Sequence, residues 1–270
     1  MKRKLACVAV LGLVSAGLLV AQDTPPAAAK IQVEPVEIQV ARPKAVKDHG
    51  LSLFGQKGTS LKLLIVLPGK NIIATDTAGC KLTTFADDKG TDLSKTRGWG
   101  SRPGWLESSS PPISKDGQAC IMELRSDAAP AKGAGKIILK AKLALKCGSG
   151  EKTHTEKVAM KAGTLIKFPP APMKVGLVRD GDWGGMKMTF TVTSDKSTES
   201  IKKVALLGPD GKEIKHRQLA SGQSSFMGKT TYETTYGLVE KADPLTVKIT
   251  YYTKMESVAV PVDISVGVGL

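Results

Sequence analysis

Two tryptophans and two arginines lie close together in one glycine-rich segment of this chain. The four residues are Arg97, Trp99, Arg102 and Trp105, and serine and proline are also frequent around them. A tryptophan face can stack on a sugar ring or a cation, and an arginine can donate paired hydrogen bonds to a carboxylate, phosphate or sulfate. We therefore predict that these residues contact a ligand. The alternative is that one or both tryptophans cover an end of the hydrophobic core.

Three aspartates form the next group that could do chemistry. Asp87, Asp88 and Asp92 lie within six residues of one another, and carboxylates at alternating positions of a loop can ligate calcium. However, Lys89 lies in the middle of this segment and the distal glutamate of a calcium loop is missing. The three aspartates are thus weak metal candidates, and a simple Asp/Gly turn after a strand is the competing interpretation.

Catalytic motifs are scarce. The chain has three histidines, His49, His154 and His216, and none has the spacing of a zinc site. No G-x-S-x-G sequence marks a serine nucleophile. We interpret the histidines as exposed and uncoupled, and we predict a protein that is not an enzyme and has no cofactor.

The cysteines bear on stability rather than on catalysis. Cys80, Cys120 and Cys147 remain if the N-terminal segment that holds Cys7 is removed. Cys120 and Cys147 lie on the apolar faces of two alternating segments, so both should point into the core. We predict a Cys120–Cys147 disulfide. A bridge to Cys80 and three buried reduced thiols are the alternatives, because connectivity cannot be read from spacing.

The elements that must position these residues are β-strands. Residues 136–147 alternate between apolar side chains and lysine, which is typical of an antiparallel strand with one face in water. Residues 61–67 form a more apolar run that predicts a buried strand, and residues 31–40 read as an edge strand interrupted by Pro35. No stretch has a sustained helical period, so the sequence predicts an all-β fold.

The proline-rich segment at residues 169–172 suggests a domain boundary. Three prolines in four residues cannot continue a strand ladder, and they favour a stiff linker. We predict a first antiparallel β-sandwich over residues 31–168 and a second over residues 173–270. The second half has short strands and turns at the spacing of a sandwich of immunoglobulin-like size.

The N-terminal segment predicts export. Lys2, Arg3 and Lys4 precede the apolar run 5–20, and a small residue, Ala21, follows; this is the pattern of a secretory signal peptide. We expect cleavage near Ala21, a flexible leader over residues 22–30, and no transmembrane segment in the processed chain. The protein should therefore be secreted or periplasmic.

Composition narrows the function classes without identifying one. The 270 residues include 39 lysines and arginines, 25 aspartates and glutamates, and 41% hydrophobic residues, which is enough apolar content to build a core. The basic residues are scattered, and export makes nucleic acid an unsuitable partner. We predict a non-catalytic envelope or periplasmic protein that binds a glycan, a polyanion or a protein partner. A hydrolase with a carboxylate cluster and an assembly subunit that pairs through a sheet edge are the alternatives.

Overall fold

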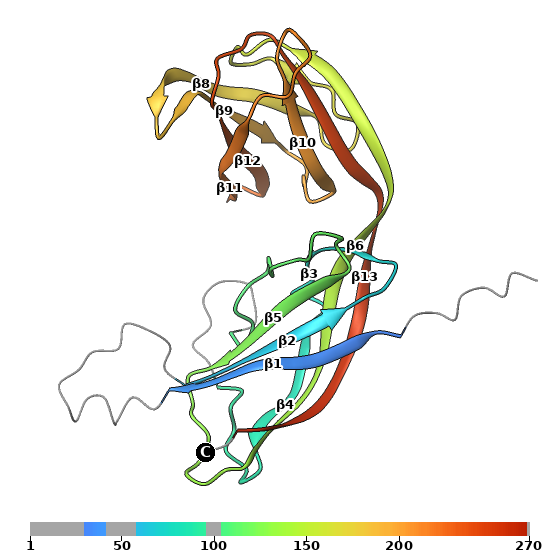
Figure 1. The fold of residues 1–270 in the computed structure, drawn as a ribbon, viewed down its shortest axis with the longest axis vertical. Helices are drawn as coiled ribbons and strands as arrows, with labels where there is room; N and C mark the ends of the chain where they lie inside the picture. The colour runs from blue at the N-terminus through green and yellow to red at the C-terminus, as the bar shows by residue number, and fades with distance from the viewer. Residues whose placement is uncertain (1–29, 42–57, 96–103, 269–270) are drawn as a thin grey trace, which may run out of the picture.

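The computed structural model describes residues 30–41, 58–95 and 104–268, and every regular element in these ranges is a β-strand. Thirteen strands form three sheets in which all neighbouring strands are antiparallel (Figure 1). The all-β prediction is confirmed. No helix in the described part of the chain is long and apolar enough to span a membrane.

Each sheet draws its strands from a different part of the chain. Sheet A has the order β1 (Gln32–Ala41), β2 (Gly58–Val66), β5 (Ala119–Ser126). Sheet B has the order β10 (Ile201–Leu207), β13 (Leu245–Gly267), β6 (Lys136–Val158), β3 (Asn71–Thr75), and β4 (Lys81–Asp87) also pairs with β6. Sheet C has the order β11 (His216–Phe226), β12 (Lys229–Leu238), β9 (Met186–Ser194), β8 (Met173–Trp183), β7 (Leu165–Ile166).

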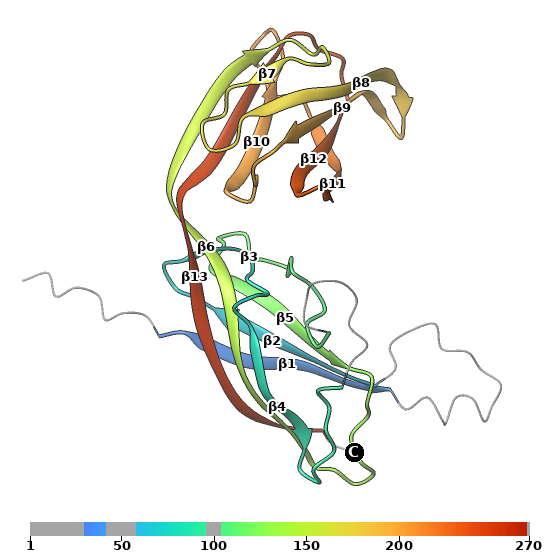
Figure 2. The same cartoon turned by 180° about the vertical axis from the view of Figure 1, so that it is seen from behind.

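Two long strands join the two lobes of the molecule. β6 and β13 have 23 residues each, and they pair from Leu245 opposite Val158 to Gly267 opposite Lys136. Figure 1 and Figure 2 show this ribbon running from one lobe into the other. The middle of the ribbon, around residues 149–153 and 253–257, is exposed. Sheet B is therefore shared between the lobes.

The first lobe packs sheet A against one half of sheet B. Leu61, Leu63 and Ile65 of β2 are fully buried, as the apolar run predicts. They share a core with Leu143 of β6 and Val260 of β13. β1 lies at the edge of sheet A, and its register with β2 shifts just after Pro35, which agrees with the expected edge strand.

The second lobe packs sheet C against the other half of sheet B. Its core combines Phe190 of β9 and Val175 of β8 with Ile249 of β13 and Leu206 of β10. Each lobe thus has two layers with one hydrophobic core between them.

The proline-rich segment does not separate these two cores. Phe168 and Ala171 are fully buried in the core of the second lobe, so the segment packs within that lobe. Val158, from the expected first domain, belongs to the second core, whereas Val260, from the expected second domain, belongs to the first core. The chain instead passes between the lobes through β6 and β13, because both strands are long enough to contribute to both cores.

Candidate functional site

The three aspartates of the candidate metal site hold backbone groups instead of converging on one point. Asp87 accepts hydrogen bonds from three N–H groups, Asp88 accepts one from Gly135, and Asp92 accepts bonds from Ser94. Within the described ranges, no group of three or more histidine, cysteine, aspartate or glutamate side chains could hold a metal ion. The arrangement fits the turn interpretation.

Asp87 is a buried carboxylate with a structural role. Its side chain accepts the N–H groups of Lys89, Thr91 and Ala131 at 2.6–2.9 Å, and the residue is only 2% exposed. Burial acts to raise the pKa of this carboxyl, but the hydrogen bonds from Ala131, Thr91 and Lys89 outweigh it, so the pKa lies below its ordinary value. The carboxylate is charged, and both of its oxygens already accept backbone hydrogen bonds. A catalytic acid would instead need to hold a proton that it can donate.

Of the four candidate ligand contacts in the tryptophan–arginine segment, only Trp105 belongs to the part of the chain that the structure describes. Arg97, Trp99 and Arg102 lie outside the described residues. Trp105 is 9% exposed and packs in the first core, so its ring covers the core and is not presented to a ligand. Its backbone carbonyl accepts the N–H of Arg125, whose guanidinium pairs with Glu107 and Glu123.

The expected Cys120–Cys147 disulfide is not formed in this structure. Cys80, Cys120 and Cys147 are all free and buried, as in the alternative of three buried reduced thiols. The prediction that Cys120 and Cys147 point inward is confirmed, since both belong to the first core. Burial raises the pKa of the Cys120 thiol to about 12 and that of Cys147 to about 11.

The two described histidines are not fully exposed. The ring of His154 lies 3.2 Å from Glu156 and packs near Phe168, and His216 lies 3.1 Å from the carbonyl of Ile214. Each is half-buried: His154 lies on β6, which contributes Val158 to the second core, and the ring of His216 packs near Tyr236. The hydrogen-bond partners of the two rings are the carboxylate of Glu156 and the carbonyl of Ile214, and neither is a hydroxyl or thiol that a histidine could activate.

The sequence did not reveal the most distinctive feature, a pocket of about 210 Å³ in the second lobe. The pocket opens between sheet C and the β10 end of sheet B. Its floor is apolar and consists of Phe190, Val192, Val204, Leu206, Val247 and Ile249. These residues come from three strands, so no local motif marks them.

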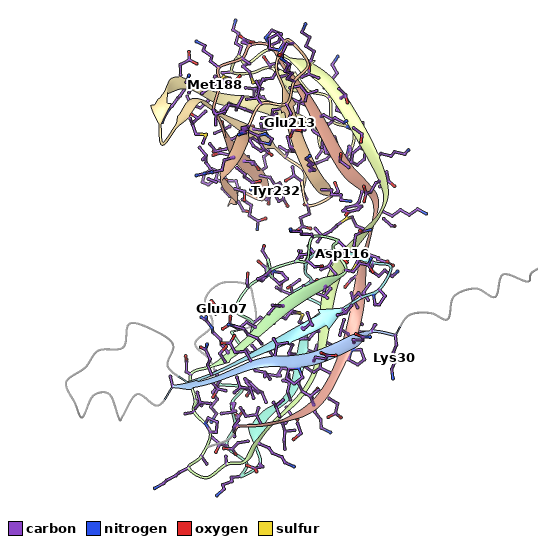
Figure 3. All side chains as sticks on the ribbon, viewed as in Figure 1. Lys30, Glu107, Asp116, Met188, Glu213 and Tyr232 are labelled. Atoms are coloured by element: carbon purple, nitrogen blue, oxygen red, sulfur yellow. The ribbon has the colours of Figure 1, made fainter. Side chains whose placement is uncertain are left out.

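Polar but uncharged side chains surround this apolar floor. Tyr232, Thr234 and Tyr236 of β12 line the pocket together with Gln218 and Ser221 of β11. The Tyr236 ring stacks on Phe190 with 5.5 Å between centroids, and burial raises the pKa of Tyr236 to about 12. Among the described residues that line the pocket, none is charged. Figure 3 shows Tyr232 on the side of the second lobe that faces the first lobe.

The backbone beside the pocket has a strand edge that is open at Val204, whereas residues 213 and 214 cover the same edge at Leu207 and Leu206. β10 is the terminal strand of sheet B and pairs with β13 alone among the described strands. The carbonyl of Leu206 points away from β13, because it accepts the N–H of Ile214 at 2.8 Å. Val204, two residues earlier, therefore turns its backbone N–H and carbonyl toward the same edge. Its side chain lines the pocket, so edge and pocket are adjacent.

Comparison with known proteins finds no matching family model, no similar curated protein and no similar solved structure.

Proposed function

We propose that this chain is an exported, non-catalytic binding protein that holds an extended segment of a protein partner at the second lobe. An apolar side chain of the partner enters the pocket, and the backbone of the partner pairs with the edge of β10 that is open at Val204. The observation that carries the proposal is the uncharged pocket beside Val204. Export rests on the signal-peptide pattern of residues 1–21, which lie outside the described residues.

The size and lining of the pocket favour an apolar group. Cavities of about 150 Å³ lined by apolar side chains bind benzene, and this pocket has about 210 Å³. Burying a charged group here would be costly, since the described lining offers no counter-ion. The hydroxyl and amide groups of Tyr232, Gln218 and Ser221 can bond to the polar backbone of a bound segment.

The edge of β10 that is open at Val204 favours a peptide over a small molecule. Strand addition supplies main-chain hydrogen bonds for affinity, and pockets for alternate side chains supply selectivity. A chain laid along Val204 would direct one side chain toward the pocket and the next toward solvent. The proposed function therefore joins two of the classes that the sequence suggests: a protein that binds a protein partner, and a subunit that pairs through a sheet edge.

The other classes have less support. A hydrolase would need carboxylates that converge in a cleft, whereas Asp87, Asp88 and Asp92 bind separate backbone groups. A glycan-stacking role would need exposed rings, whereas Trp105 is buried. We also propose that each lobe is a β-sandwich module of immunoglobulin-like size, since each core lies between two sheets.

A pair of short, capped, uncharged peptides tests the pocket. Both alternate threonine and valine; one has leucine and the other has glycine at its centre. We expect the leucine peptide to bind at least tenfold more tightly in fluorescence anisotropy, because only leucine fills the pocket.

Two variants of the same strand give the matched comparison. Thr234→Trp fills the pocket from β12 and should weaken binding of the leucine peptide at least tenfold. Thr235→Trp adds the same ring to the opposite face of β12 and should leave binding unchanged. Equal binding of the two peptides, or equal effects of the two variants, would refute the proposed function.

A further inference from the structure

The outer face of sheet B in the second lobe carries no carboxylate at its centre. β10, β13 and β6 run side by side here, with their inner residues in the second core (Figure 2). The strand register gives three rows of outward residues: Lys203, Thr250 and Thr153; Ala205, Lys248 and Thr155; Leu207, Thr246 and Lys157. Four of the nine positions are threonine and three are lysine.

The three lysines lie on one diagonal of this array. Lys203 is opposite Thr250, and Lys157 is opposite Thr246, so each is a diagonal neighbour of the central Lys248. Diagonal neighbours on antiparallel strands are roughly 7–8 Å apart at their Cβ atoms. All three lysines are exposed. We call Lys157, Lys203 and Lys248 the lysine diagonal.

No acidic side chain in the described ranges neutralises the lysine diagonal. None of the three lysines belongs to an ion pair of the described structure, whereas Lys140 and Lys146 of the same sheet pair with Asp263 and Glu199. Two acids lie at the ends of the array. Glu151 is engaged by Lys202, and Glu213 is opposite Leu207 at a corner without pairing with the diagonal. The centre of the face therefore attracts anions.

We propose that the lysine diagonal binds a linear, flexible polymer of phosphodiester-linked polyols. An ammonium group is a compact point charge that suits phosphate oxygens, and the threonine hydroxyls between the lysines can donate hydrogen bonds to the same oxygens. A polymer with one negative charge per repeat can lay successive phosphates along the diagonal. A row of charges that crosses three neighbouring strands suits such an extended ligand better than a compact one.

The composition of the face selects among anionic polymers. Sugar rings and nucleobases gain affinity by stacking on exposed aromatic rings, and none of the nine positions is aromatic. Tyr252, at the end of the array, is 6% exposed and lies beneath Lys202. The choice of an extracellular polymer rests on export, but binding at this face is independent of the pocket and of the partner segment.

Two triple variants with the same charge change test the proposal. K157Q/K203Q/K248Q removes the diagonal, and K115Q/K132Q/K229Q removes three other exposed lysines. Binding of poly(glycerol phosphate) is measured by calorimetry at several salt concentrations. We expect the diagonal variant to bind at least tenfold more weakly at low salt, and the control variant to stay within about threefold of the parent.

The salt dependence gives a second readout. Loss of three phosphate contacts should make the negative slope of log K against log salt shallower by about 2. This figure takes about 0.7 per contact, as for single-stranded polyanions. Single-stranded DNA and a sulfated polysaccharide serve as competitors and should bind more weakly than the polyol polymer. Equal weakening by both triple variants, an unchanged slope, or tighter binding of either competitor would overturn the proposal. Thermal unfolding confirms that both variants are folded.

Discussion

The Oδ2 atom of Asp87 accepts a hydrogen bond from the backbone N–H of Ala131 at 2.6 Å, although the two residues are 44 positions apart in the chain. Its Oδ1 atom accepts the N–H groups of Lys89 and Thr91. One buried carboxylate thus ties the turn after β4 to the loop before β6. The aspartates that the sequence offers for chemistry are used to fix the loops of the first lobe.

Removal of this carboxylate should destabilise the protein. We expect D87A to lower the free energy of unfolding by about 2 kcal/mol at pH 7, because buried N–H groups would lose their acceptor. Urea denaturation measures the difference. D263A is the control, since the carboxylate of Asp263 is 71% exposed and holds a surface ion pair with Lys140. Equal losses in the two variants would contradict a special role for Asp87.

The same contact predicts a pH dependence. The pKa of Asp87 is lowered in the folded state, so the unfolded chain binds the proton first as the pH falls. The stabilisation is complete above the unfolded pKa of about 4 and is lost as the pH falls through the folded pKa. The difference in unfolding free energy between the parent and D87A should be constant from pH 7 to 5 and shrink below about pH 4. If the difference in unfolding free energy grew in acid, the pKa of Asp87 would be raised in the folded state and the prediction would be wrong.

Gly148 lies where the ribbon leaves the first core, and it has no room for a side chain. A Cβ atom there would be 2.4 Å from two ring carbons of Tyr252 and 2.8 Å from Ile73. We expect G148A to cost about 1–3 kcal/mol through overpacking. G222A is the matched control, because Gly222 is also in a strand and has nothing within 4 Å of its Cβ position. Thermal denaturation of both variants compares them, and similar melting temperatures would contradict the crowding.

Alternation along the chain predicted the strands that bury one face. Leu139, Leu143, Leu145 and Cys147 share the inner face of β6, as the pattern of residues 136–147 indicates. The pattern failed where a strand buries neither face. The middle of β13 is polar and exposed, so the apolar alternation is interrupted there although the strand continues through it.

The candidate pocket could not be predicted by the same means. Its lining residues, such as Phe190, Val204 and Tyr236, belong to different strands and look like ordinary core positions in the sequence. Only the pairing order of β10, β13, β9 and β12 brings them together. The aspartate and tryptophan candidates can be recognised in the sequence because their residues are close together in the chain. The pocket cannot, because it depends on the register between strands that are far apart in the chain.

The buried thiols should resist alkylation in the folded protein. At pH 8 we expect no labelling of Cys80, Cys120 or Cys147 by iodoacetamide in the native state, because all three are buried and burial raises their pKa values. Unfolding in urea without a reductant should expose all three to the reagent. Labelling of Cys80 alone under these conditions would reveal a Cys120–Cys147 disulfide instead, and mass spectrometry of the peptides distinguishes the two results.

The shared ribbon makes a prediction about chain fragments. If the chain is divided at the proline-rich segment, residues 173–270 lose Val158 and Phe168, which are at most 1% exposed in the second core. Residues 22–168 lose β13, which carries Val260 of the first core and pairs along the whole of β6. We expect neither fragment to unfold cooperatively alone, and we expect co-expression to restore a cooperative thermal transition by re-forming the β6–β13 ribbon. If each isolated fragment instead unfolded in a cooperative transition, the domain boundary would lie at residues 169–172. Neither lobe would then need the β6–β13 pairing in order to fold.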